Sequence, residues 1–332
     1  MALGLYSSFK HFSFNSKICF LTGEEATVVS TVFPDWLLDK YQLSDRPIKL
    51  LDERIVSYQS ITVPTSKNTA KNISDLNNEL KEFFERGFEK IKALPEVRLF
   101  QWIGNLLYGM IYFEIGEAIK QQAGTDGNLN FSQSLIHKFE NLQFMLHSLI
   151  VPVEFEGIKP WTILVFKVDN PPDTFSYRDE INTLSFSLRM NDFGIVACLQ
   201  DNNSNRKYHQ EMLEKIGEQT LHPIQFEEIC ARFFYSSYLF NRLPEYTILP
   251  TRETVYIEAM PFFSSSGKAL FDQWQNKTYA QVLENFWKPW SVLMFEILKI
   301  PEKPLSFLFN QTGGLKTPEQ AAEGIKTIAI RD

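Results

Sequence analysis

The polar segment from residue 169 to residue 180 contains the side chains whose types and spacing come closest to those of a catalytic site. Two aspartates flank an Asn-Pro-Pro stretch, and three further charged residues follow. The candidates are Asp169, Asp173, Arg178, Asp179 and Glu180. Paired carboxylates can serve as a general acid and a general base if they converge in one cleft with perturbed pKa values. A solvated Pro-Pro loop explains the same residues more simply, so both interpretations stay open.

The cysteines and histidines are not spaced like a metal site or a nucleophile site. The chain has three cysteines and five histidines. It has no Cys-x-x-Cys or His-Glu-x-x-His spacing, which would favour zinc, and no Gly-x-Ser-x-Gly elbow. Cys198 and Cys230 fall in apolar segments and are expected to be inert core thiols. We therefore expect no catalytic residue, metal or cofactor from this set.

Composition and charge narrow the class of protein. With 332 residues, 44% hydrophobic and 22% charged, the chain is expected to fold into about two globular domains. Acidic residues outnumber basic ones by 40 to 33, so a positive field that coats nucleic acid is not expected. Scattered cysteines and the lack of an apolar leader predict a cytoplasmic protein. The sequence does not determine the oligomeric state.

The apolar segment 99–119 is expected to be a buried core helix and not a membrane span. It contains Gln101, Asn105, Glu114 and Glu117. A membrane-spanning helix would hold these polar groups inside hydrocarbon at a cost of several kcal/mol. We therefore expect no membrane association.

The hydrophobic period predicts an α+β protein with a helical middle and an antiparallel sheet with helices in its C-terminal part. Apolar residues recur at helical spacing in three successive segments, which are 74–92, 97–121 and 131–149. Asn72 is expected to cap the first of these helices. The period then becomes two in segment 183–190, and Asn191-Asp192 predicts a two-residue hairpin leading into segment 193–200.

Two N-terminal segments carry a pattern of residues that matches a known type of finger. Cys-Phe-Leu-Thr-Gly at 19–23 is followed by Val-Phe-Pro-Asp-Trp-Leu-Leu at 32–38, and Val-Pro-Thr-Ser-Lys-Asn-Thr stands at 63–69. This pattern resembles bacterial HNH-endonuclease-like proteins with a treble-clef, or ββα-metal, finger. In that family a Cys-x-x-Cys-Gly knuckle precedes His-Val-Phe-Pro-x-Trp-Leu, and a second Cys-x-x-Cys-Asn knuckle leads into a helix. The resemblance covers residues 17–90.

The resemblance implies a degenerate finger. Matched position by position, Cys19 keeps the first zinc ligand, while Thr22 stands at the second and Thr31 at the water-activating histidine. Thr65 and Asn68 stand at the second knuckle. Threonine hydroxyls are poor zinc ligands and do not accept a proton near neutral pH. The resemblance therefore implies the fold of the finger without its zinc and without its nuclease chemistry.

These observations lead to three hypotheses about function. We expect a degenerate HNH-like finger region at 1–95 and a helical and antiparallel-sheet domain at 96–332. The first hypothesis is a non-catalytic HNH-like protein with a binding or scaffolding role. Nucleic acid is a partner only by analogy with that family. The alternative is an enzyme of unknown class whose acidic site lies in the C-terminal domain. A residual nuclease with a different base is a third possibility.

Overall fold

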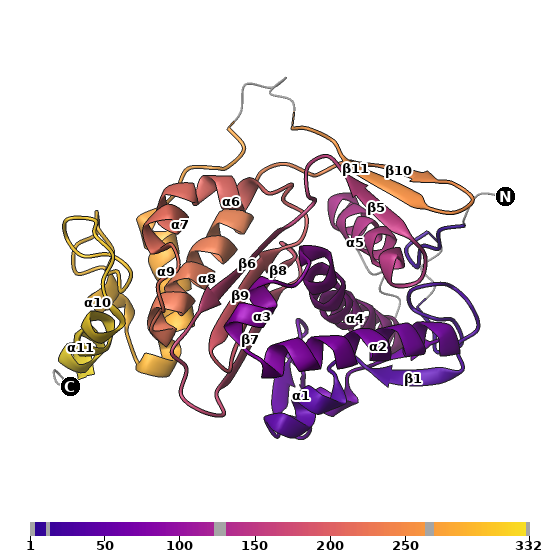
Figure 1. The fold of residues 1–332 in the computed structure, drawn as a ribbon, viewed down its shortest axis with the longest axis horizontal. Coiled ribbons are helices and arrows are strands. Elements are labelled where there is room, and N and C mark those ends of the chain that lie inside the picture. Colours follow the sequence, from indigo (N-terminus) through magenta and orange to yellow (C-terminus); the bar gives the residue numbers. More distant parts are fainter. Residues whose placement is uncertain (1–3, 11–13, 123–130, 263–268, 330–332) are drawn as a thin grey trace. The chain divides into compact units, whose positions relative to one another are not determined.

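Changes in the hydrophobic period along the chain, from helical spacing to alternation and back, produce a mixed α+β fold in the computed structural model (Figure 1). The structure describes residues 4–10, 14–122, 131–262 and 269–329. The chain divides into two compact units. Unit 1 comprises 1–86, 93–160 and 243–261, and unit 2 comprises 87–92, 161–242 and 262–332.

Unit 1 combines helices with three small sheets. β1 pairs with β4 and β2 with β3, both antiparallel, while β11 pairs antiparallel with β10 and parallel with β5. The strands are β1 (Val28–Thr31), β2 (Pro47–Lys49), β3 (Ile55–Ser57), β4 (Thr62–Thr65), β5 (Val153–Glu156), β10 (Tyr246–Pro250) and β11 (Val255–Ala259). The helices are α1 (Asp35–Lys40), α2 (Lys67–Glu85), α4 (Glu96–Gln122) and α5 (Gln133–Leu146).

Helix α2 begins earlier than the hydrophobic spacing predicts. The expected cap at Asn72 is wrong, because Ser66 is the N-cap and its Oγ accepts the backbone N–H of Thr69. Asn72 lies inside the helix, where its Nδ2 donates to the carbonyl oxygen of Leu149 over 2.9 Å. The predicted single helix also ends early, at Glu85. Gly87 follows with φ of +78°, a conformation that favours glycine.

The core of unit 1 forms where α2 and α5 pack on α4. Phe84 of α2 and Trp102 of α4 meet edge to face with ring centroids 5.0 Å apart, and both are buried. Phe20 stacks on Tyr108 at 5.8 Å, which attaches the N-terminal segment to α4. The predicted core helix at 97–121 is thus confirmed as α4. Among the described residues, no helix is both long enough and apolar enough to cross a membrane.

Unit 2 is built on a four-stranded antiparallel sheet in the order β6-β9-β8-β7. Its strands are β6 (Thr162–Lys167), β7 (Phe175–Glu180), β8 (Ser185–Met190) and β9 (Phe193–Cys198). Helix α8 packs on β8 and β9, and α9 packs on α8 (Figure 1). The helices are α3 (Phe88–Lys92), α6 (Ser204–Tyr208), α7 (Gln210–Ile216), α8 (Pro223–Leu239), α9 (Asn276–Trp287), α10 (Met294–Ile297) and α11 (Pro318–Ala329).

The predicted hairpin at Asn191-Asp192 is confirmed, since Met190 of β8 pairs with Phe193 of β9. Every residue of β8 is buried, including its polar face. Helix α8 covers that face and offers partners: Arg189 Nε lies 3.3 Å from Glu227 Oε1. A buried charge persists only when it is paired in this way.

The two compact units group the chain differently from the division at residues 95 and 96. Residues 1–86 and the two long helices α4 and α5 share unit 1, whereas the four-stranded sheet lies in unit 2. Residues 243–261 return to unit 1 because β11 forms a parallel pair with β5. Whether 1–95 folds as a domain by itself stays a prediction.

Candidate functional site

The side chain of Cys19 lies in a buried cluster of hydroxyl and backbone N–H groups. The chain turns back at residues 19–23, where the N–H of Gly23 donates to the carbonyl oxygen of Cys19 over 3.1 Å. Cys19 and Thr69 are both 0% exposed, and Cys19 Sγ lies 3.4 Å from Thr69 Oγ1. The hydroxyl of Ser66 donates to Thr69 Oγ1 over 3.1 Å. The turn and the start of α2 therefore enclose the thiol.

This environment lowers the pKa of Cys19. Burial by itself raises the pKa of a thiol. Hydrogen bonding of the sulfur with the hydroxyls of Thr22 and Thr69 and with the N–H groups of Leu21 and Ser66 outweighs burial, so the pKa of Cys19 lies below its usual value. We call Cys19, Thr22, Ser66 and Thr69 the Cys19 cluster.

The structure brings some of the predicted finger residues together and leaves others apart. Cys19 and Thr22 share the cluster. Thr65 Oγ1 instead lies 2.8 Å from Ser30 Oγ on the β1–β4 pair, Asn68 is exposed, and Thr31 Oγ1 donates to Asp35 over 3.3 Å.

Sequence reasoning missed the second pair of cluster residues, Ser66 and Thr69. Their spacing repeats that of Cys19 and Thr22, so a signal was present. Because α2 starts at Lys67, Ser66 and Thr69 fall on one side of its first turn, while Asn68 points to solvent.

The described residues offer no cluster of metal-ligating side chains. No group of three or more His, Cys, Asp or Glu residues within them is placed to hold a metal ion. Cys19, Cys198 and Cys230 are all free and buried. Hydroxyl groups in the Cys19 cluster would be weak ligands for zinc.

The acidic residues singled out between 169 and 180 do not share one environment. The backbone N–H of Asp169 donates to Leu221 and thereby joins the loop to the sheet, and Asp173 occupies a left-handed turn position with φ of +58°. Asp179 and Glu180 are neighbours on β7, so their side chains point to opposite faces of the sheet. Arg178 lies 3.7 Å from Glu227 of α8 in a buried ion pair.

Asp179 has a perturbed carboxyl group. Burial raises its pKa to about 6, and the neighbouring charge of Glu180 adds to this effect, while a hydrogen bond from Tyr177 opposes it. A carboxyl with a raised pKa is able to act as a proton donor near neutral pH. Its location on the face opposite to Glu180 separates it from the pocket described next.

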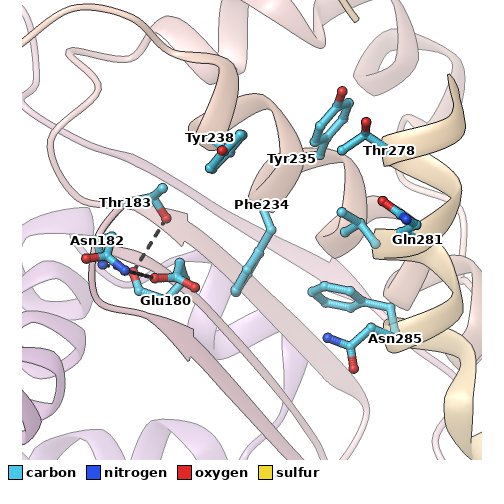
Figure 2. Close-up of a pocket in the computed structure, with 11 residues that line it drawn as sticks. Glu180, Asn182, Thr183, Phe234, Tyr235, Tyr238, Thr278, Gln281 and Asn285 are labelled. Carbon is cyan, nitrogen blue, oxygen red and sulfur yellow. Dashed lines mark hydrogen bonds between the residues drawn. The ribbon is translucent and has the colours of Figure 1, made fainter. Parts of the chain in front are cut away.

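A pocket in unit 2 is formed by three segments that are distant in sequence (Figure 2). They are the β7–β8 connection at 180–183, the last turns of α8 at 234–238, and one side of α9 at 278–286. Its volume of about 420 Å³ lies in the range of small-ligand sites. We call it the α8–α9 pocket.

Aromatic rings and amides make up most of the walls of the α8–α9 pocket. The rings are Phe234, Tyr235, Tyr238 and Phe286, and the amides are Asn182, Gln281 and Asn285. Figure 2 shows Glu180 bound to Asn182 at one end of the pocket, with Oε1 of Glu180 2.9 Å from Nδ2 of Asn182. Tyr238 is 74% exposed at the entrance, so a bound ring would cover apolar surface that now faces water.

The walls of the α8–α9 pocket offer several groups for binding. Among the described residues they contain one carboxylate and no histidine, cysteine or lysine. The rings offer stacking surfaces, and the amides and threonine hydroxyls offer both donors and acceptors.

The fold and the pocket define the class of protein as an α+β protein with a ligand-sized pocket beside an antiparallel sheet. In comparisons with known proteins, no family model, no curated protein and no solved structure matches this chain.

Proposed function

We propose that this protein is a non-catalytic binding protein and that its α8–α9 pocket holds a small ligand with a planar apolar surface and polar edges. The observation that carries the proposal is the composition of that pocket: four rings and three amides surround a single carboxylate. Planar ligands gain from stacking on rings, and amides satisfy the polar edge of such a ligand without adding charge.

The Cys19 cluster supports the further proposal that the N-terminal region is a degenerate HNH-like finger. A turn with Cys19 and Thr22 stands beside the first turn of a helix with Ser66 and Thr69, in an arrangement of two pairs. Zinc supplies much of the folding free energy of ordinary fingers. In this chain, hydrogen bonds to the thiol and the packing of Phe20 on α4 take its place.

The alternative proposal, an acidic active site in the C-terminal part, has less support. Asp179 and Glu180 project from opposite faces of β7, and Asp169 and Asp173 lie in the loop before it. The carboxyl groups of Asp179 and Glu180, which lie on opposite faces, do not face one substrate.

Ligand binding tests the main proposal. Neutral nucleosides and tryptophan amide serve as planar probes in a titration followed by calorimetry. We expect at least one probe to bind, and Tyr238→Ala and Gln281→Ala to weaken it about tenfold, because each removes part of the wall. Phe295→Ala is the matched control, since Phe295 is 68% exposed in the same unit and does not line the pocket. Equal binding by Tyr238→Ala and the parent protein would contradict the proposed site.

Metal analysis tests the proposal for the finger. The protein purified without chelator is expected to carry zinc far below one ion per chain and to show no divalent-metal-dependent nuclease activity. Zinc at one ion per chain that is lost in Cys19→Ser would show that the finger still binds metal.

A further inference from the structure

A second cavity in unit 2 is separate from the α8–α9 pocket and has a different chemical character. It measures about 1110 Å³ and lies among the end of α7, the middle of α8, the start of α9 and the loop between α10 and α11. Its cationic walls are Lys215, Arg232, Lys299, Lys303 and Lys316. We call it the basic cavity.

Positive charge exceeds negative charge in the basic cavity although the whole chain is acidic. Its walls include two carboxylates, Glu296 and Glu302. Glu228 lies next to it, fully buried, and pairs with Arg232 at 2.9 Å. Glu211 also pairs with Lys215 at 2.8 Å, and with all four carboxylates counted the five cations still outnumber them in a protein of net charge −7. A local excess of this kind attracts anions.

Two buried donors, which belong to side chains that line the basic cavity, have no hydrogen-bond partner among the described residues. The hydroxyl of Tyr279 is one, and Tyr279 is only 3% exposed. The Nε–H of Arg232 is the other, and the guanidinium carbon lies 5.3 Å from the ring centroid of Tyr279. A buried donor without a partner destabilises the fold, so such groups call for an explanation.

Neighbouring contacts show that these two donors are held in place. The Nη2 of Arg232 is fixed by Glu228, and Glu228 also accepts from the backbone N–H of Phe307 and Leu308 over 2.7 and 3.0 Å. The ring of Tyr279 stacks on Tyr235 at 5.9 Å. The O–H and N–H groups are therefore preorganised, which lowers the entropic cost of binding an acceptor.

We propose that the basic cavity binds a small molecule bearing a phosphate or diphosphate group, whose oxygens accept from Tyr279 and Arg232. Oxyanions match both observations, because they accept hydrogen bonds and carry the charge that the lysines favour. A diphosphate suits a site with several lysines better than a single carboxylate does, because it carries more negative charge. This site goes beyond the proposed function, since it shares no wall residue with the α8–α9 pocket.

Calorimetric titration of the full chain with inorganic pyrophosphate and with adenosine diphosphate tests the proposal. We expect saturable binding of at least one probe. Tighter binding of the nucleotide would show that the site also recognises the base or sugar, whereas equal binding would show that it recognises the diphosphate. Citrate is the control for charge alone. The proposal would be overturned if citrate bound as tightly as pyrophosphate. It would also be overturned if neither pyrophosphate nor adenosine diphosphate bound.

The variant Tyr279→Phe separates a ligand-binding role from a structural one. It removes only the unpartnered hydroxyl, so we expect the free protein to be at least as stable as the parent protein while binding weakens about tenfold. Tyr208→Phe is the matched control, because Tyr208 lies in the same unit and outside the cavity. Unchanged binding by Tyr279→Phe would contradict the assigned contact.

The variant Lys303→Ala tests the electrostatic part of the proposal. Lys303 is exposed at the cavity, and we expect its loss to weaken pyrophosphate binding severalfold and to reduce the salt dependence of that binding. Lys288→Ala, an exposed lysine of the same unit outside the cavity, is expected to bind like the parent protein. Equal effects of the two substitutions would indicate a general charge effect and would overturn the site.

Discussion

The Sγ atom of Cys19 lies 3.4 Å from Oγ1 of Thr69, a residue 50 positions further along the chain, and both side chains are fully buried. This contact joins the N-terminal turn to the first turn of α2. The sulfur also interacts with the hydroxyl of Thr22 and with the N–H groups of Leu21 and Ser66.

Replacing Cys19 by alanine is expected to lower the free energy of unfolding by about 2 kcal/mol. The substitution leaves the N–H groups of Leu21 and Ser66 buried without their acceptor, and this loss adds to that of the sulfur packing. Chemical denaturation measures the difference. Cys230→Ala, another buried cysteine, is the control and should cost less, because Cys230 is not surrounded by N–H donors in the same way. Equal losses would argue against a special role for the cluster.

The N-cap serine of α2 is expected to contribute more to the free energy of unfolding than the N-cap serine of α5. Ser66→Ala and Ser132→Ala each remove an Oγ that accepts a backbone N–H three residues later, worth about 1 kcal/mol. Ser66 is buried and also bonds the Thr69 hydroxyl, whereas Ser132 is exposed. Unfolding in denaturant should therefore show a larger decrease in the free energy of unfolding for Ser66→Ala than for Ser132→Ala. A smaller loss for Ser66→Ala would show that the cluster adds nothing to the cap.

Glu228 is expected to hold the segment before α11 in place. Its buried carboxylate accepts from Ser306 Oγ and from the backbone N–H groups of Phe307 and Leu308, and it pairs with Arg232. Glu228→Gln should lower the free energy of unfolding by about 3 kcal/mol and speed proteolysis near residue 306. Glu284→Gln is the comparison, because that less buried carboxylate accepts only one backbone N–H, from Met294. A Glu228 variant as resistant to protease as the parent would contradict this role.

Asp179 is expected to make stability depend on pH. Its folded pKa, about 6, lies above the ordinary value of 3.8, so its protonated form is the one that folding favours. Its contribution to stability is therefore present below about pH 4 and is lost as the pH rises through about 6. Asp179→Asn should abolish this loss and be relatively more stable than the parent protein at pH 7 to 8.

Unfolding curves across this pH range check the prediction for Asp179. Asp173→Asn removes the same charge from the loop before β7 and serves as the control for net charge. If Asp179→Asn and the parent protein show parallel stability profiles, the raised pKa does not contribute to folding.

Local patterns in the sequence were sufficient to predict much of the fold. The alternation in segment 183–190 and the Asn191-Asp192 turn identified the β8–β9 hairpin, because strand period and turn type depend on neighbouring residues. The long apolar period likewise identified α4 within one residue at each end. It did not locate the start of α2, because Ser66 follows a strand-like Val-Pro-Thr stretch and its capping role depends on the buried Thr69.

The Cys19 cluster and the α8–α9 pocket could be identified only from the tertiary structure. The sequence by itself determined that the chain is an acidic α+β protein and which side chains of β8 share a face. Only the tertiary structure shows that Ser66 and Thr69 lie next to Cys19. It also shows that the side chains of Asp179 and Glu180 lie on opposite faces of the sheet. It also decided that segments near residues 180, 235 and 280 enclose one pocket. The reason is physical: periodicity records how a residue relates to its own helix or strand, whereas a pocket depends on packing between elements that are distant in sequence.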